Sequence, residues 1–309
     1  MFGNRVLKGV FLVGFGATSY GMLATFVKLA YSATGVSGNP FTPAEVIISQ
    51  FILGIIAILI INGYQKAKKG DTVLKASGKD IRQLMIAGTS TGLTSIFYYL
   101  AVKYIPVSIG IVLLMQTVWM GVLLEMVLDK KRPSNIKIAA VLVVLIGTAL
   151  ATNLIQNQTE LDWRGIVLGL LAAASFTTTM FTANRVAVLI SSAQRSLYML
   201  LGGAVIVFIF AAVTQNTPFN YDIFYKWGIL LALFGTVIPP MLMNAGFPLT
   251  GIGLGSIVSA LELPVSVLMA FFILNESVIL SQWIGILLII VAIVIMNINF
   301  KKKAISSDS

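Results

Sequence analysis

The acidic residue most deeply embedded in apolar sequence is Glu262, in the segment Ala260-Leu261-Glu262-Leu263-Pro264. Pro264 has no N–H to donate to the carbonyl of Ala260, so a helix through this segment is opened or kinked there. Apolar surroundings favour the neutral form of a carboxyl group. These features predict that Glu262 exchanges a proton or hydrogen-bonds a ligand. The alternative is a neutral Glu that closes a hydrogen bond between two helices.

A second set of candidate residues is mostly uncharged. Gln116, Thr117 and Trp119 lie together in Met115-Gln116-Thr117-Val118-Trp119, where an amide and a hydroxyl can hydrogen-bond and an indole can stack. The further candidates on other apolar stretches are Tyr20, Tyr98, Tyr99, Asn244 and the cation Lys28. The alternatives are ordinary hydrogen bonds between helices and, for Lys28, extension of the side chain to a membrane interface. For Glu125, near the cluster Asp129–Arg132, we expect an ion pair.

The residue types that are missing limit the chemistry. The sequence contains no cysteine and no histidine, which removes disulfides, thiolate nucleophiles and the commonest metal ligand. It contains no zinc-binding His pair, Ser-His-Asp set or phosphate-binding loop either. We therefore predict a protein that is not an enzyme and that needs no cofactor or metal.

The elements that carry these residues are long apolar segments. Of 309 residues, 58% are hydrophobic and only 10% are charged, whereas about 25% of a soluble protein is charged. About 20 apolar residues cross a bilayer as a helix. Ten stretches qualify: Gly9–Tyr31, Ala44–Gly63, Gln83–Val102, Pro106–Leu128, Ile136–Leu154, Trp163–Val188, Arg195–Thr214, Tyr225–Phe247, Thr250–Leu274 and Leu280–Asn299. The predicted fold class is an all-α polytopic membrane protein with ten transmembrane helices.

The distribution of basic residues predicts the orientation. With a cytoplasmic N-terminus, 17 of the 21 Lys and Arg residues fall on the inside, three fall on the outside, and Lys28 lies within the first helix. This asymmetry follows the positive-inside rule and predicts cytoplasmic N- and C-termini in the cell (inner) membrane. It also accounts for the net charge of +10 without a nucleic-acid partner.

Weak internal similarity predicts two repeats. An offset of 146 residues pairs Gln116 with Glu262, Asp129 with Asn275 and Tyr98 with Asn244. Five spans per half is an odd number, so the second half is expected to be inverted. Inverted repeats are typical of secondary transporters, whose binding site lies near the midplane. The predicted units are a first five-helix repeat at 1–154, a second at 155–300 and a basic tail at 301–309.

One motif connects these features to a known family. Glu262-Leu263-Pro264-Val265, followed by Leu274-Asn275-Glu276, is similar to the Glu-Pro-Val and Gly-Glu signature of EamA-type members of the drug/metabolite transporter superfamily. The resemblance implies a central cavity lined by helices 1, 3, 4, 6, 8 and 9. It also implies transport of small polar metabolites, often export of amino acids or related compounds.

Together these features predict a secondary transporter that works by alternating access, with a proton as the candidate coupling ion. Glu262 is expected at the centre of the site, with Lys28 at the outer side. The expected partners are a small-molecule substrate and the lipid bilayer, and the protein is expected to be a monomer or homodimer. A lipid-carrier flippase and an integral-membrane lipid-modifying enzyme remain as alternatives.

Overall fold

The computed structural model describes residues 2–35, 38–69, 74–105, 107–130, 132–152, 162–275 and 277–307. All the regular elements in these ranges are helices. They are α1 (Phe2–Ser32), α2 (Pro43–Lys69), α3 (Gly78–Ala101), α4 (Val107–Leu114), α5 (Thr117–Asp129), α6 (Asn135–Ala151), α7 (Trp163–Arg185), α8 (Ser192–Thr214), η2 (Phe224–Gly228), α9 (Ile229–Ala232), η3 (Leu233–Val237), α10 (Ile238–Thr250), α11 (Ile252–Ser259), α12 (Glu262–Leu274) and α13 (Leu280–Ser307).

Several helical segments are long and apolar enough to cross a membrane. Among the described residues there are eight, and several of the shorter elements join end to end to form them. Examples are Phe224–Thr250, which contains two π-helical turns, and Ile252–Leu274. Two further apolar helices, Asn135–Ala151 and Leu280–Met296, are shorter. The protein is therefore a multi-pass helical membrane protein, and each predicted apolar stretch falls on one of these helices.

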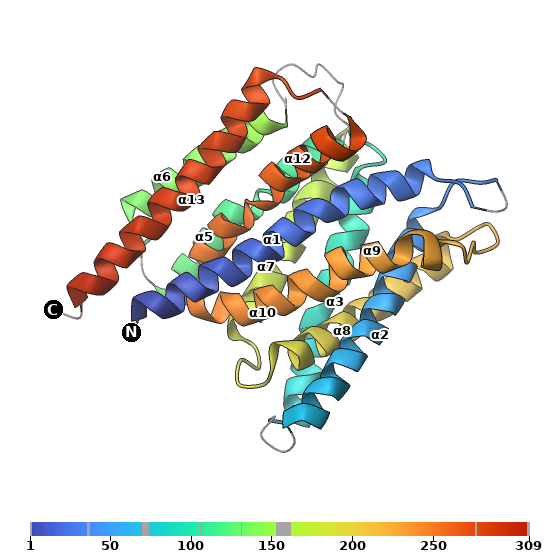
Figure 1. Cartoon of the computed structure of the whole chain (residues 1–309), viewed down its shortest axis with the longest axis horizontal. Helices are drawn as coiled ribbons and strands as arrows, with labels where there is room; N and C mark the ends of the chain where they lie inside the picture. The colour runs from blue at the N-terminus through green and yellow to red at the C-terminus, as the bar shows by residue number, and fades with distance from the viewer. Residues whose placement is uncertain are drawn as a thin grey trace.

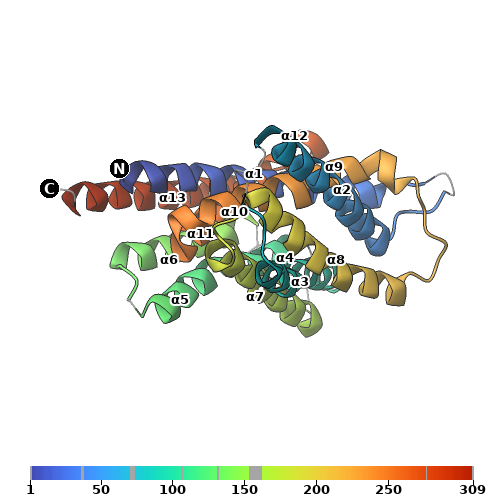
Figure 2. The same ribbon diagram turned by 90° about the horizontal axis from the view of Figure 1, so that it is seen from below.

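The helices form one elongated bundle (Figures 1 and 2). The helix α1 lies along α10 and α12, and α3 packs between α7 and α8. The pair α6 and α13 lies together at one edge of the bundle, and the two termini are at the same end (Figure 1). The close approach of α3 to α8 requires glycine, because a Cβ on Gly88 would collide with the carbonyl oxygen of Met199.

The described part of the chain contains two broken helices of the same design. In the first, α4 and α5 are interrupted at Met115-Gln116; in the second, α11 and α12 are interrupted at Ala260-Leu261. At both breaks the backbone N–H donates three residues back: Val118 N to Met115 O at 3.1 Å, and Leu263 N to Ala260 O at 3.2 Å. The predicted opening of the helix next to Pro264 is present, but the first break forms without a proline.

The two broken helices correct the predicted register of the repeat. Val107 and Ile252 begin equivalent segments, and Asp129 and Leu274 end them, so the offset is 145 residues rather than 146. Each second segment is then capped by a residue with positive φ, Lys130 at 51° and Asn275 at 53°. Thr117, and not Gln116, is therefore the counterpart of Glu262. Sequence similarity had selected the wrong register because no residue identity marks the first break.

The predicted pairing of Tyr98 with Asn244 fails for a related reason. The connection between α3 and α4 spans residues 102–106, whereas Gly251 alone separates α10 from α11. The residue offset that relates the two broken helices therefore does not also relate α3 to α10. The predicted boundary at residues 154/155 and Glu276 of the quoted motif lie outside the described residues, as do the side chains of the predicted tail at 301–309.

Candidate binding cavity

A cavity of about 480 Å³ lies between the helices, towards the end of the bundle that is far from the termini. Its walls come from α1, α2, α3, α4, α7, η3 and α12, with the end of α6 and the start of α13 at its rim. The resemblance implied a lining by the first, third, fourth, sixth, eighth and ninth of the ten predicted stretches. The structure adds α2, which is the second stretch, to this lining. At the other end, a hydrophobic core cluster fills the bundle, with fully buried residues that include Val13, Met115, Val118, Phe247 and Ile257.

Glu262 lies on the cavity wall as the first residue of α12, directly after the helix break. Its Oε2 atom is buried and has no hydrogen-bond partner among the described residues. The backbone of α12 approaches α1 closely here, because a Cβ on Gly21 would collide with the carbonyl oxygen of Glu262. The hydroxyl groups of Tyr20 and Tyr98 lie close enough to the Glu262 carboxyl group to interact with its charge.

Aromatic side chains form much of the remaining wall. Tyr20 meets Phe176 edge to face, with ring centroids 5.9 Å apart. Tyr99 contacts both Tyr98 and Tyr31, at centroid distances of 6.3 and 6.2 Å. Aromatic faces attract cations and stack on flat apolar groups. These rings and the Glu262 carboxyl group lie on the wall of the same cavity.

Three polar groups on this wall were not among the sequence candidates. Gln50 Oε1, Tyr31 Oη and Thr91 Oγ1 are buried without a hydrogen-bond partner among the described residues, and all three residues line the cavity. The signal for Gln50 was present, since it is an amide within an apolar stretch. It was missed because α2 was not expected at the cavity.

The other predicted site residues divide into two groups. Lys28 lines the cavity as an exposed residue, and Asn244 lines a separate cavity of about 30 Å³ that shares Tyr20 with the large one. Gln116, Thr117 and Trp119 line neither cavity. The Trp119 indole instead donates to Gln116 Oε1 at 2.8 Å on an exposed face of α5. A role of these three residues in binding stays a prediction.

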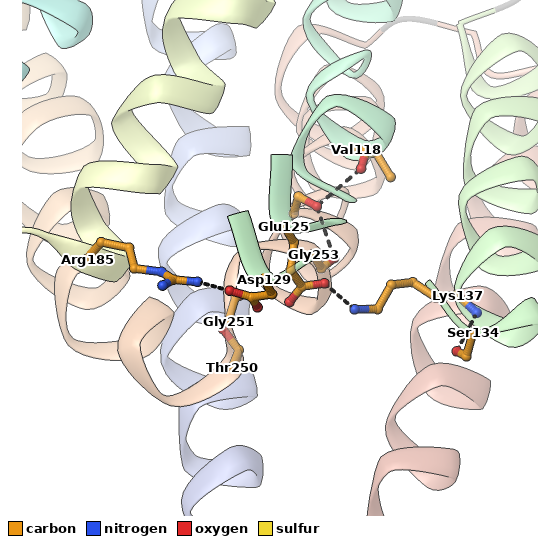
Figure 3. A network of polar contacts seen from close by, with 10 residues as sticks. Val118, Glu125, Asp129, Ser134, Lys137, Arg185, Thr250, Gly251 and Gly253 are labelled. Atoms are coloured by element: carbon orange, nitrogen blue, oxygen red, sulfur yellow. Dashed lines mark hydrogen bonds and ion pairs between the residues drawn. The ribbon is translucent and has the colours of Figure 1, made fainter. Parts of the chain in front are cut away.

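Two ion pairs hold the bundle together at the end that bears the termini (Figure 3). Lys137 of α6 donates to Glu125 of α5, and the two side chains are only 11% and 20% exposed. Arg185 at the end of α7 pairs with Asp129 at the end of α5, and both are more exposed. The expected ion pair of Glu125 is therefore present, although its partner is Lys137 rather than a residue of the cluster 129–132.

Glycine lets the carboxylate of Glu125 approach the start of α11. A Cβ on Gly251 would lie 2.9 Å from Glu125 Oε1, and one on Gly253 would lie 3.1 Å from Lys137 Nζ. Gly251 also has a φ of 76°, which a side chain would disfavour. The partly buried ion pair of the first repeat thus lies against the start of α11 in the second.

Arg195 is fully buried, and its hydrogen-bond partners among the described residues are all backbone carbonyls. Its guanidinium group donates to Thr182, Ala183 and Val186 at the end of α7, and to Asn244 of α10. The last carbonyls of a helix lack intrahelical partners and carry a partial negative charge. Arg195 therefore caps α7 and joins it to α8 and α10 next to the small cavity.

Comparison with known proteins identifies the family. The chain matches the EamA-like transporter family twice, over residues 7–153 and over residues 163–298. The chain belongs to this family. Membership identifies it as a membrane transporter of the drug/metabolite type, built from two EamA repeats.

A solved structure described only as "Crystal structure of protein" has the same fold. It aligns with a TM-score of 0.73 and 15% sequence identity, covering 94% of this chain and 96% of that chain. At this identity the likeness concerns the fold alone. A search of the curated proteins finds no match.

Proposed function

We propose that this protein is a secondary transporter that exports small polar metabolites, such as amino acids or related compounds, by alternating access. The two further apolar helices α6 and α13 complete ten spans, with the second five-helix repeat inverted relative to the first. Both termini then lie in the cytoplasm and the cavity faces outward. The distribution of basic residues supports this orientation.

One observation carries the proposal: an unpaired carboxyl group, Glu262, lies on a large cavity directly after a helix break. Discontinuous helices near the midplane form the binding sites of many secondary transporters. An ionisable residue within a membrane costs about 2.5–3.5 kcal/mol, so its retention on a cavity wall favours a functional role. In the proposed mechanism, Glu262 exchanges a proton or hydrogen-bonds the amino group of the substrate.

The two ends of the bundle supply the two access routes. The cavity extends to the far end through residues at the ends of α1, α3 and α6, including Tyr31, Val102 and Thr152. At the end with the termini, the hydrophobic core cluster and the Glu125–Lys137 pair close the route. Alternating access then requires α5, α6 and α11 to separate while the far end closes.

The experiment is counterflow of a labelled solute in proteoliposomes. A thermal-shift screen against amino acids, sugars, nucleosides and cationic drugs selects the solute, since a ligand stabilises the state that binds it. We expect Glu262→Gln to lose substrate accumulation and its dependence on pH. Unchanged rate and pH dependence in that variant would refute the proton-carrier role.

The matched control is Asp162→Asn. Asp162 is an acid outside the cavity that caps α7, and Asn caps helices equally well. This variant should transport like the wild type. Absence of counterflow with every water-soluble solute, together with movement of labelled lipid, would favour a lipid-carrier flippase instead.

A further inference from the structure

Gln50 is the most enclosed amide on the cavity wall. The residue is 5% exposed and lies in the first third of α2, and its Oε1 atom has no hydrogen-bond partner among the described residues. A buried polar group without a partner costs free energy. Such a group on a binding cavity is suited to a ligand that supplies the missing hydrogen bond.

The surroundings of Gln50 hold it in place. Thr236 donates its hydroxyl to the backbone oxygen of Gln50 at 3.1 Å and to Ala232 O at 3.0 Å. The amide lies against Gly235, where a Cβ would come within 2.9 Å of Gln50 Cδ. Gly235 and Thr236 belong to the π-helical turn η3, and both line the cavity. Turns of this kind occur frequently at functional sites.

Gln50 and Glu262 lie on opposite sides of α1. Gly21 packs against the backbone of Glu262. Leu23 packs against Gly235, and Gly235 in turn lies next to the Gln50 amide. Residues two positions apart face opposite sides of a helix and differ in height by about 3 Å. The two groups therefore lie on parts of the cavity wall that adjoin different faces of α1.

We propose that Gln50 is a second, specificity-determining pole of the binding cavity, which accepts a hydrogen bond from a second donor group of the substrate. This inference rests on the proposed function, in which Glu262 binds the amino group. Glu262 and Gln50 both offer oxygen acceptors, and the aromatic rings that line the same cavity attract cations. The substrate class is therefore an amine that carries a second N–H or O–H donor across an apolar spacer.

The probes are α,ω-diaminoalkanes of stepped chain length, each compared with the monoamine of the same length. Binding to the full-length protein is measured by calorimetry in detergent and by competition in proteoliposomes. We expect the best diamine to bind about tenfold more tightly than its monoamine. In Gln50→Leu the ratio of diamine to monoamine affinity should fall to about one.

Three controls separate the outcomes. Ser49→Ala removes a buried polar group from the same helix that bonds only locally, to Val46 O, and should keep the preference for the diamine. Gly235→Ala should weaken the preference by displacing the amide. Thermal unfolding in the absence of ligand reports whether each variant is folded.

Each result decides between the two proposals. If no amine binds the wild type, the proposed role of Glu262 in amine recognition is wrong. If amines bind through Glu262 but Gln50→Leu keeps the full diamine preference, the second pole is wrong while the proposed function stands.

Discussion

The segments α4–α6 and α11–α13 have the same backbone plan but opposite roles. Each consists of a short helix, a two-residue break, a second helix with a left-handed cap and an apolar helix, all related by 145 residues. Glu262 in the second segment lines the cavity, but its counterpart Thr117 does not. Conversely, Glu125 and Lys137 form a buried ion pair, whereas their counterparts Ala270 and Gln282 line the cavity.

Side chains therefore break the symmetry of a repeated backbone. The ion pair joins α5 to α6 at the end of the bundle opposite the large cavity. The equivalent residues Ala270 and Gln282 carry no charge and lie at the cavity. In the proposed mechanism, one repeat supplies the acid of the site, and the other supplies the charges that keep the opposite end closed. Five predictions test this division.

The largest expected effect comes from exchanging the two residues after the breaks. We expect Glu262→Thr combined with Thr117→Glu to lose counterflow completely, because a carboxyl group at position 117 is buried away from the cavity. Recovery of transport by the double variant would contradict the asymmetry. The single variant Thr117→Val shows in the same assay whether Thr117 contributes to binding.

Removing one partner of the buried ion pair should destabilise the protein. Lys137→Met leaves the Glu125 carboxylate without its cation, and we expect a loss of about 3 kcal/mol in the free energy of unfolding. The double variant Glu125→Leu/Lys137→Met should recover most of this loss, because no unpaired charge remains. Unfolding in mixed micelles measures both values, and equal stability of the single and double variants would contradict the prediction.

The same double variant should open the closed end. The sequence contains no cysteine, so Ser256→Cys introduces a single thiol at a buried position of α11 that touches α5. We expect a membrane-impermeant maleimide to label this thiol several-fold faster when the ion pair is absent. Equal labelling rates in both backgrounds would mean that the hydrophobic core cluster alone keeps this end closed.

Grafting the ion pair onto the second segment should have a moderate effect. Ala270→Glu with Gln282→Lys places the charges of Glu125 and Lys137 at the equivalent positions on the cavity rim. We expect counterflow to slow several-fold because the far end then favours closure, and the single variant Gln282→Met should slow it less. A rate equal to that of the single variant would show that charge alone does not hold either end.

The smallest effect should come from the exposed pair. Asp129 and Arg185 are 39% and 44% exposed, and an exposed ion pair contributes about 1 kcal/mol or less. Asp129→Asn should therefore lower the unfolding temperature only slightly, and less at high salt. A loss as large as that of Lys137→Met would mean that this pair, rather than Glu125–Lys137, secures the closed end.

The sequence determined the membrane class, the approximate helices, the helix break beside Pro264 and Glu262 as the acid of greatest interest. These features follow from local properties, namely hydropathy over about 20 residues and the missing N–H of proline. The resemblance carried by Glu262-Leu263-Pro264-Val265 also led to the family that the chain matches.

Only the tertiary structure decided which polar residues share a cavity. The register of the repeat depended on a break at Met115-Gln116 that no proline marks, so Gln116 was assigned the place of Thr117. Gln50 reached the cavity because α2 packs against η3, and Lys137 met Glu125 because α6 folds back onto α5. Side chains distant in the sequence meet according to how helices cross and rotate, and hydropathy, which records only preference for lipid, carries no information on that geometry.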